Sequence, residues 1–288
     1  MEQAIAFLER AESRAFALGL EDVRVAAIVG QARARLWLGD YATARLLATQ
    51  VPRDFEYWAE YSFNDPQQFN ELYMVTWGDV EAIRWTVGDG SSPTRGNERW
   101  EHFDAFVALN LLEREPEDFT AFSTSIPVVL QHLYARPDAR VLVASGAEAA
   151  LIRAEADVRD GLTASAEATL NGLRPDYSFR ATVRWGVDPP DEGNELQPLT
   201  LTGDLQTDLK TVADERAREL WLTGDRLTTS RRLRLDPSVD IDLFPPVKSA
   251  VGGGDDIAFP IPRLELDTNP NLDAGAACPA PQEIGAWR

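Results

Sequence analysis

The chain has 288 residues, of which 44% are hydrophobic, and its formal net charge is −19. So acidic a surface repels phosphate backbones, which argues against a nucleic-acid-binding protein. The single cysteine, Cys278, excludes an internal disulfide and a cysteine-rich metal site, and no run of about 18 apolar residues indicates a membrane span.

The first 55 residues are predicted to form helices. In the first helix the apolar residues recur at three- and four-residue spacings and so form one stripe. These residues are Ala4, Ile5, Leu8, Ala11 and Ala15. A second helix is expected over residues 22–38, with Asp22 as its N-cap, and a third over residues 41–51. The corner Gly39-Asp40-Tyr41 and the small alanines around it are typical of a tetratricopeptide-like helix pair, which needs partners elsewhere to bury its face.

Residues 56–117 differ in composition and are predicted to be an aromatic-rich insertion of helix and loop. Residues 52–117 hold the rings of Tyr57, Trp58, Tyr61, Phe63, Phe69, Tyr73, Trp77, Trp85, Trp100, Phe103 and Phe106, among others. Residues 118–175 are expected to hold a second helical pair, over 147–160 and 164–173, with Gly161 ending its first helix. Glu155 and Arg159 stand at i and i+4 in that first helix, where an ion pair forms most readily.

Residues 176–288 begin with a segment predicted to be a short strand or an extended insertion, followed by a long helix from about Asp204 to Leu233. The tail from Phe259 to Leu272 holds three prolines, which exclude both a helix and a central strand. Because its large apolar residues favour burial, we expect a non-regular strap laid over the folded body.

Three of these stretches together resemble the SusD/RagB family. The first runs from Ser145 to Arg174 and the second from Asp214 to Arg226, with Arg231-Arg232 following; the third is the tail from Phe259 to Leu272. They occur in the family's order, and with the Gly39-Asp40-Tyr41 corner the resemblance covers roughly residues 1–60 and 118–275.

The resemblance implies a single, mostly α-helical domain over residues 1–288, in which tetratricopeptide-like pairs carry the insertion and the strap. It also implies a non-catalytic protein, lipid-anchored at the outer-membrane surface of the cell, that binds an oligosaccharide or other small nutrient. The implied partner is a SusC-like TonB-dependent transporter. Family members begin with a signal peptide and a lipid-modified cysteine, whereas this chain opens inside a helix. We therefore expect a C-terminal portion of a longer precursor or a late start, with the lipid anchor absent from this chain.

Matched motifs do not carry the family's ligand residues, so the ligand site is predicted from the aromatic insertion. A flat ring covers the apolar face of a sugar, and nearby polar groups bind its hydroxyls. The predicted ligand-binding residues are Trp77, Trp85, Trp100, Asp89 and Asn97. The competing interpretation is that each tryptophan fills a gap between helices.

Two other function classes stay open. A tetratricopeptide-like adaptor would bind a protein segment in its groove. This class predicts contiguous repeats, whereas in this chain the aromatic insertion separates the two helical pairs. A glycoside hydrolase would use a carboxylate pair, but 47 acidic residues make chance pairs common. His102 and His132 have no partner at metal-ligand spacing, and no phosphate loop or nucleophile elbow occurs, so no cofactor, metal or catalytic residue is predicted.

Overall fold

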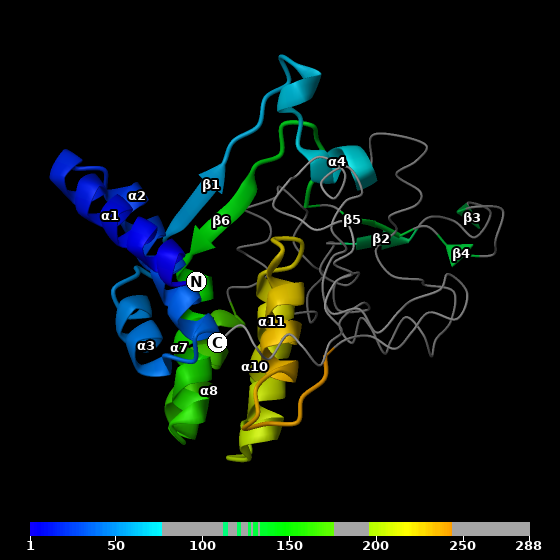
Figure 1. Ribbon diagram of the computed structural model, residues 1–288. Coiled ribbons are helices and arrows are strands. Elements are labelled where there is room, and N and C mark those ends of the chain that lie inside the picture. The colour runs from blue at the N-terminus through cyan, green and yellow to red at the C-terminus, as the bar shows by residue number, and fades with distance from the viewer. Residues whose placement is uncertain are drawn as a thin grey trace, which may run out of the picture. The chain divides into compact units, whose positions relative to one another are not determined.

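A computed structural model describes residues 1–76, 133–175 and 196–243, together with short strands between residues 112 and 131. The chain divides into two compact units, Met1–Thr223 and Gly224–Arg288. Helices dominate the described residues (Figure 1), which confirms the predicted mostly α fold class.

Helices α1 (Glu2–Leu18) and α2 (Glu21–Trp37) form the first hairpin. Gly19 joins them with φ of 69°, in the left-handed region that glycine adopts without steric cost. The expected N-cap of α2 is wrong, because Leu20 occupies that position and Asp22 lies in the first helical turn. There its carboxylate still lies near the positive end of the helix dipole.

The predicted apolar stripe of α1 is only partly buried. Ile5 and Ala15 are buried, and Leu8 is half-buried, but Ala4 and Ala11 are exposed. The buried face is narrower than the predicted stripe, and the side toward α2 also includes Glu12, whose carboxylate accepts a hydrogen bond from Gln31 at 2.7 Å.

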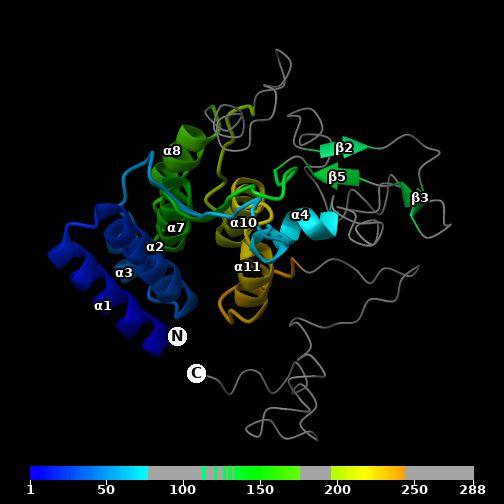
Figure 2. The same cartoon turned by 90° about the horizontal axis from the view of Figure 1, so that it is seen from above.

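Helix α3 (Tyr41–Ala48) follows the predicted corner, and the Asp40 carboxylate caps it by accepting from the Thr43 backbone N–H. The second predicted pair is also present as α7 (Gly146–Arg159) and α8 (Thr163–Leu173), with Gly161 at φ of 71° between them. Figure 2 shows α2, α3, α7 and α8 gathered on one side of the unit.

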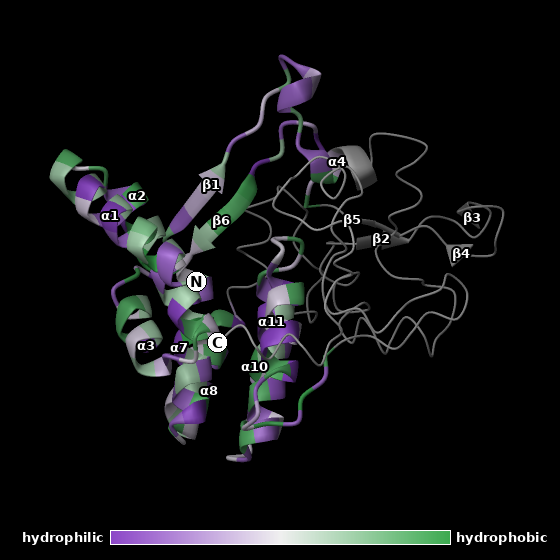
Figure 3. Cartoon of the chain, in the orientation of Figure 1, coloured by the Kyte–Doolittle hydropathy of each residue, from purple (hydrophilic) through white to green (hydrophobic). Residues whose placement is uncertain are grey.

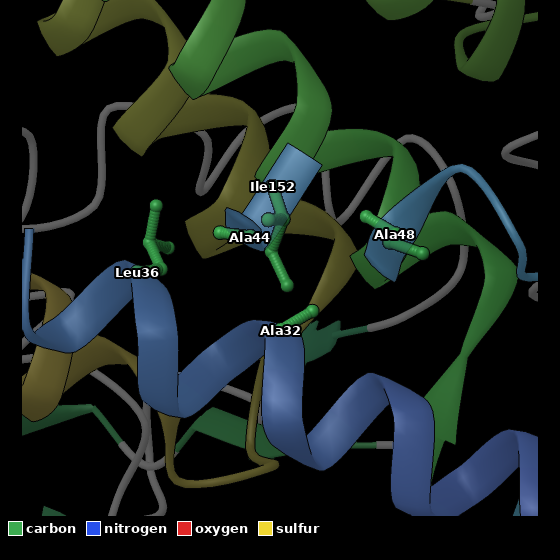
Figure 4. Packing of buried hydrophobic residues seen from close by; sticks show 6 residues of the cluster. Ala32, Leu36, Ala44, Ala48 and Ile152 are labelled. Atoms are coloured by element: carbon green, nitrogen blue, oxygen red, sulfur yellow. The ribbon is translucent and has the colours of Figure 1, made fainter. Parts of the chain in front are cut away.

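The two pairs meet in one apolar core, which confirms that the first pair finds its partner later in the chain. Figure 4 shows side chains of α2, α3 and α7 pointing toward one another. The buried members are Ala32, Leu36, Ala44, Ala48, Ala149 and Ile152. Four of the six are alanines, and their small side chains allow the three helix backbones to approach closely.

Charged side chains surround this core and join the two pairs. Arg45 of α3 lies 3.1 Å from Asp157 and 2.7 Å from Asp160, at the end of α7. The predicted pair of Glu155 with Arg159 is confirmed at 3.3 Å and is buried. The Arg159 guanidinium also lies 4.2 Å from the ring centre of Tyr41, which gives the corner tyrosine a direct contact with α7.

The sequence did not predict the two-stranded antiparallel ribbon of β1 (Glu56–Ala59) and β6 (Val141–Ser145). Figure 1 shows the two strands side by side, and Figure 3 shows that β6 is more hydrophobic than β1. A short 3₁₀ helix (Pro66–Gln68) and α4 (Glu71–Thr76) follow β1. Two further antiparallel pairs are short: β2 with β5 (Leu112–Arg114, Val129–Gln131) and β3 with β4 (Thr120–Ala121, Ile126–Pro127).

The predicted long helix is interrupted, so that prediction is wrong in its extent. Helix α10 (Leu205–Glu219) is the last described helix of the first unit, and α11 (Asp225–Arg234) belongs to the second unit. Between them Leu222 has φ of 58° and Gly224 has φ of 87°, both incompatible with a right-handed helix. The extended segment expected after residue 175 lies largely outside the described residues, and the tail strap lies wholly outside them.

Candidate functional site

None of the five predicted ligand residues falls within the described part of the chain: Trp77, Trp85, Trp100, Asp89 and Asn97 all lie in the gap after residue 76. The role assigned to them therefore stays a prediction. The described beginning of the same aromatic segment, however, includes β1 of the β1–β6 ribbon, and two of its rings each lie against an arginine. We call Trp58, Tyr61, Phe63, Arg136 and Arg140 the ribbon site.

The ribbon is fixed to the helices by Arg33 of α2. Its guanidinium donates to both carboxylate oxygens of Glu148, at 2.6 and 2.7 Å, and to the carbonyl oxygen of Val143 at 2.9 Å. Tyr57 pairs with Ala144 and Trp58 with Leu142, so the register skips Val143. A bulge of this kind leaves a backbone group outside the ladder, and here a side chain of α2 binds it.

The junction of β6 with α7 is equally close-packed. Ser145 caps α7 by accepting from the Glu148 backbone N–H at 3.1 Å, and the Gly146 N–H donates to the Phe55 carbonyl at 2.8 Å. A side chain at Gly146 would lie closer than 3.0 Å to the carbonyl oxygens of Pro52 and Arg53. The chain leading into β1 therefore lies directly against the start of α7.

The far end of the ribbon is held by Asn70, which is buried. Its backbone N–H donates to the Pro137 carbonyl and its side-chain amide to the Ala139 carbonyl, each at 2.7 Å. Its side-chain oxygen accepts from the Leu72 N–H at 2.8 Å. One side chain thus joins the segment after β1 to the segment before β6, which carries both arginines of the ribbon site.

We expect the change Asn70→Asp to destabilise the ribbon by about 1–3 kcal/mol, because a buried carboxylate cannot donate to the Ala139 carbonyl. Chemical denaturation with tryptophan fluorescence measures this change. Asn64, which is exposed in the same segment, provides the matched control Asn64→Asp, whose expected effect is within about 0.5 kcal/mol. Equal stability of the two variants would contradict the role given to Asn70.

Each arginine of the ribbon site lies over an aromatic ring. The guanidinium carbon of Arg140 is 4.1 Å from the ring centre of Trp58, and that of Arg136 is 5.7 Å from the ring centre of Phe63. Arg136 also forms a two-pronged ion pair with Asp138, at 3.0 and 2.9 Å. Phe63 is 55% exposed and Trp58 and Tyr61 are half-buried, so the rings are accessible from solvent.

Tyr134 provides a fixed support near Tyr61. Its side chain is fully buried, and its hydroxyl donates to the Leu222 carbonyl at 3.4 Å. Burial raises the pKa of Tyr134 well above its ordinary value, and the neighbouring Tyr61 raises it further. The phenol is therefore neutral throughout the physiological range and acts as a packing and hydrogen-bonding group.

A second polar cluster, on α8 and α10, is structural. Arg174, at the end of α8, donates to the Glu215 carboxylate and, at 2.5 Å, to the Gln197 carbonyl. The Glu215 carboxylate also accepts a hydrogen bond from Arg218 at 2.6 Å. All three charged side chains are largely buried. The pair of Arg174 with Glu215 therefore joins α8 to α10, and the pair of Arg218 with Glu215 lies within α10.

Within the described ranges no group of three or more histidine, cysteine or acidic side chains is arranged to hold a metal ion. The described helices also include none with the length and hydrophobicity required to cross a membrane.

Sequence reasoning counted the ribbon's rings among the aromatic residues of the insertion but singled out others. Arg136 and Arg140 were missed altogether, because they lie more than 70 residues beyond Trp58 in the chain and nothing local marks them. The pairing of β1 with β6 and the hydrogen bonds of Asn70 bring the two segments together.

No family model matches the sequence, and no curated protein matches it either. Among solved structures, the crystal structure of a SusD superfamily protein from Bacteroides vulgatus is similar, with a TM-score of 0.41 and 14% sequence identity. The similarity covers 73% of this chain and 51% of that protein, so the chain spans about half of its length. A superposition of this quality does not establish a common fold, and membership of the SusD/RagB family therefore stays a prediction from the sequence motifs.

Proposed function

We propose that this chain is a non-catalytic binding protein for an oligosaccharide or another small nutrient, acting at the cell surface and passing its ligand to a SusC-like TonB-dependent outer-membrane transporter. The observation that carries the binding role is the ribbon site, in which accessible rings stand beside polar groups on a fixed support. Tryptophan and tyrosine rings cover the apolar face of a sugar, while guanidinium and phenol groups bind its hydroxyls.

The support of the site favours binding over a purely structural role. Arg33 and Gly146 fix one end of the ribbon and Asn70 the other, so the rings are held in place before a ligand arrives. A preorganised site loses less conformational entropy on binding. The surface location and the transporter partner are supported by the sequence resemblance alone.

We expect the change Trp58→Ala to weaken glycan binding about tenfold or more, because it removes the ring that would cover the sugar face. A glycan array with purified protein identifies the ligand, and isothermal titration calorimetry then measures the affinity. The matched control is Phe16→Ala, which removes an exposed ring on α1 outside the ribbon site and should leave the affinity unchanged. Unchanged affinity of a folded Trp58→Ala protein, or equal loss in both variants, would contradict the proposed site.

A specific observation also favours the adaptor as a second candidate. On helix α1 the side chains of Phe7, Phe16 and Leu18 are 66%, 75% and 62% exposed. Large apolar side chains on a surface often mark a protein contact. The adaptor predicts binding to helical peptides on a peptide array, loss of that binding in Phe7→Ser with Leu18→Ser, and no glycan binding. Glycan binding that depends on Trp58 and not on α1 would reject it.

A further inference from the structure

We propose that the ribbon site selects an anionic sugar, with Arg140 binding the carboxylate or sulfate of a ring that stacks beside it. This inference rests on the proposed function and adds the chemical class of the ligand.

The position of Arg140 leaves its donors available. Its guanidinium lies over the face of Trp58, and the side chain is half-buried. The N–H donors of a guanidinium lie in its own plane, so contact between its face and a ring holds the group in place without using them. A planar carboxylate then accepts two parallel hydrogen bonds along one edge, which fixes the orientation as well as the charge of the ligand.

Arg140 also differs in its pairing from many other arginines of the first unit. In the described part of the first unit, Arg33, Arg45, Arg136, Arg159, Arg174 and Arg218 each lie within ion-pair distance of a carboxylate. No described carboxylate lies within 4.0 Å of the Arg140 guanidinium, even though Glu60 follows directly after the last pair of the ladder, Ala59 with Val141.

The composition strengthens the contrast. The chain has 47 acidic residues and only 28 lysines and arginines, so its carboxylates outnumber its cationic side chains. The same excess repels an anionic ligand from most of the surface. Binding of such a ligand therefore requires a local cation that is not already neutralised, and Arg140 provides one beside an aromatic ring.

The two contacts match the two sides of an acidic sugar. The ring of a uronic acid presents apolar C–H groups to an aromatic face and carries its carboxylate at the edge. The accessible rings of the ribbon site would cover the sugar, while the guanidinium edge of Arg140 binds the charged group. Sulfated sugars share the negative charge but present it tetrahedrally, so both classes belong in the test.

The first experiment uses the unaltered protein and requires no variant. Calorimetry compares oligogalacturonate with its methyl-esterified counterpart, sulfated galactan oligosaccharides with the unsulfated form, and each at low and high salt. We expect the charged form of one pair to bind about tenfold tighter than the neutral form, because a charge-assisted hydrogen bond replaces a neutral contact. We also expect this advantage to shrink at high salt.

The second experiment assigns the effect to Arg140. In Arg140→Gln the preference for the charged form should disappear, and in Arg140→Lys it should return in part. Arg10→Gln is the matched control, since the Arg10 guanidinium also lies over a ring, 4.5 Å from the centre of Phe7, but on α1 outside the ribbon site, and it should retain the preference. Glu60→Gln removes a nearby negative charge and should raise the affinity for the charged form twofold to threefold, roughly as expected for a screened surface charge.

The outcomes separate this inference from the proposed function. Binding of neutral sugars that depends on Trp58, with no preference for the charged form, overturns the inference and leaves the function standing. A preference that survives in a folded Arg140→Gln protein also overturns it. Failure of every sugar in both pairs and on a broad glycan array rejects the function and the inference together.

Discussion

The change Gly146→Ala is expected to destabilise the protein by about 3 kcal/mol or more, or to prevent folding. An added Cβ would lie closer than 3.0 Å to the carbonyl oxygens of both Pro52 and Arg53. Both are backbone atoms and cannot rotate away as a flexible side chain could. Relief therefore requires the segment before β1 to move, which would break the hydrogen bond from the Gly146 N–H to the Phe55 carbonyl.

Gly172 provides a matched control for this change. It also lies in a helix of the second pair, α8, but a Cβ there would meet nothing within 4 Å. Because alanine favours a helix over glycine, Gly172→Ala should be neutral or stabilise the protein by up to about 1 kcal/mol. Thermal and urea unfolding, followed by circular dichroism, measure both variants. Equal stabilities would show that the close approach at Gly146 is absent in solution.

The change Arg33→Ala is expected to cost about 2–4 kcal/mol, the second largest effect that the structure predicts. The Glu148 side chain is only 3% exposed, and each of its carboxylate oxygens accepts a hydrogen bond from Arg33 of α2. Removal of the guanidinium leaves a buried carboxylate without that partner and a bulge carbonyl without its donor. The 42% exposure of Arg33 keeps the loss below that of a fully buried pair, because water then reaches part of the site.

Arg24 lies on the same helix and supplies the control. It pairs with Glu21 one turn away, and Glu21 is 65% exposed, so Arg24→Ala should change the free energy of unfolding by less than about 1 kcal/mol. In the double variant Arg33→Met with Glu148→Leu the buried charge is gone, and we expect most of the stability to return. If Arg33→Ala were no more destabilising than Arg24→Ala, the ion pair would not hold the ribbon to the helices.

The changes Gly146→Ala and Arg33→Ala also affect the proposed function, since Gly146 and Arg33 fix the ribbon that carries Trp58 and Arg140. A variant that remains folded but loosens this junction should lose ligand affinity without losing any residue of the ribbon site. This would resemble a binding defect in an assay, and unfolding measurements on the same samples distinguish the two.

Local sequence signals predicted the helices of both pairs to within a few residues. The Gly39-Asp40-Tyr41 corner and Gly161 mark real ends, because left-handed glycines and an aspartate cap act within one helical turn. The same signals failed between α10 and α11. There the apolar and charged pattern continues, and the interruption includes Leu222, a residue that rarely adopts positive φ on its own account.

The ribbon was missed for a different reason. Residues 56–59 and 141–145 pair across more than 80 intervening residues, and strands as short as these carry little periodic signal. The ribbon site shares this origin, since each ring lies on one segment and its arginine on the other.

By itself, therefore, the sequence determined the helical class, the corners and the pairs that stack on one alanine-lined core, because helix formation and capping depend on neighbours within four residues. Tertiary structure alone decided which arginine contacts which ring. It also decided that Gly146 must lack a side chain and that Glu148 takes its partner from α2. These contacts join segments far apart in the chain, and packing selects them only after the helices have met.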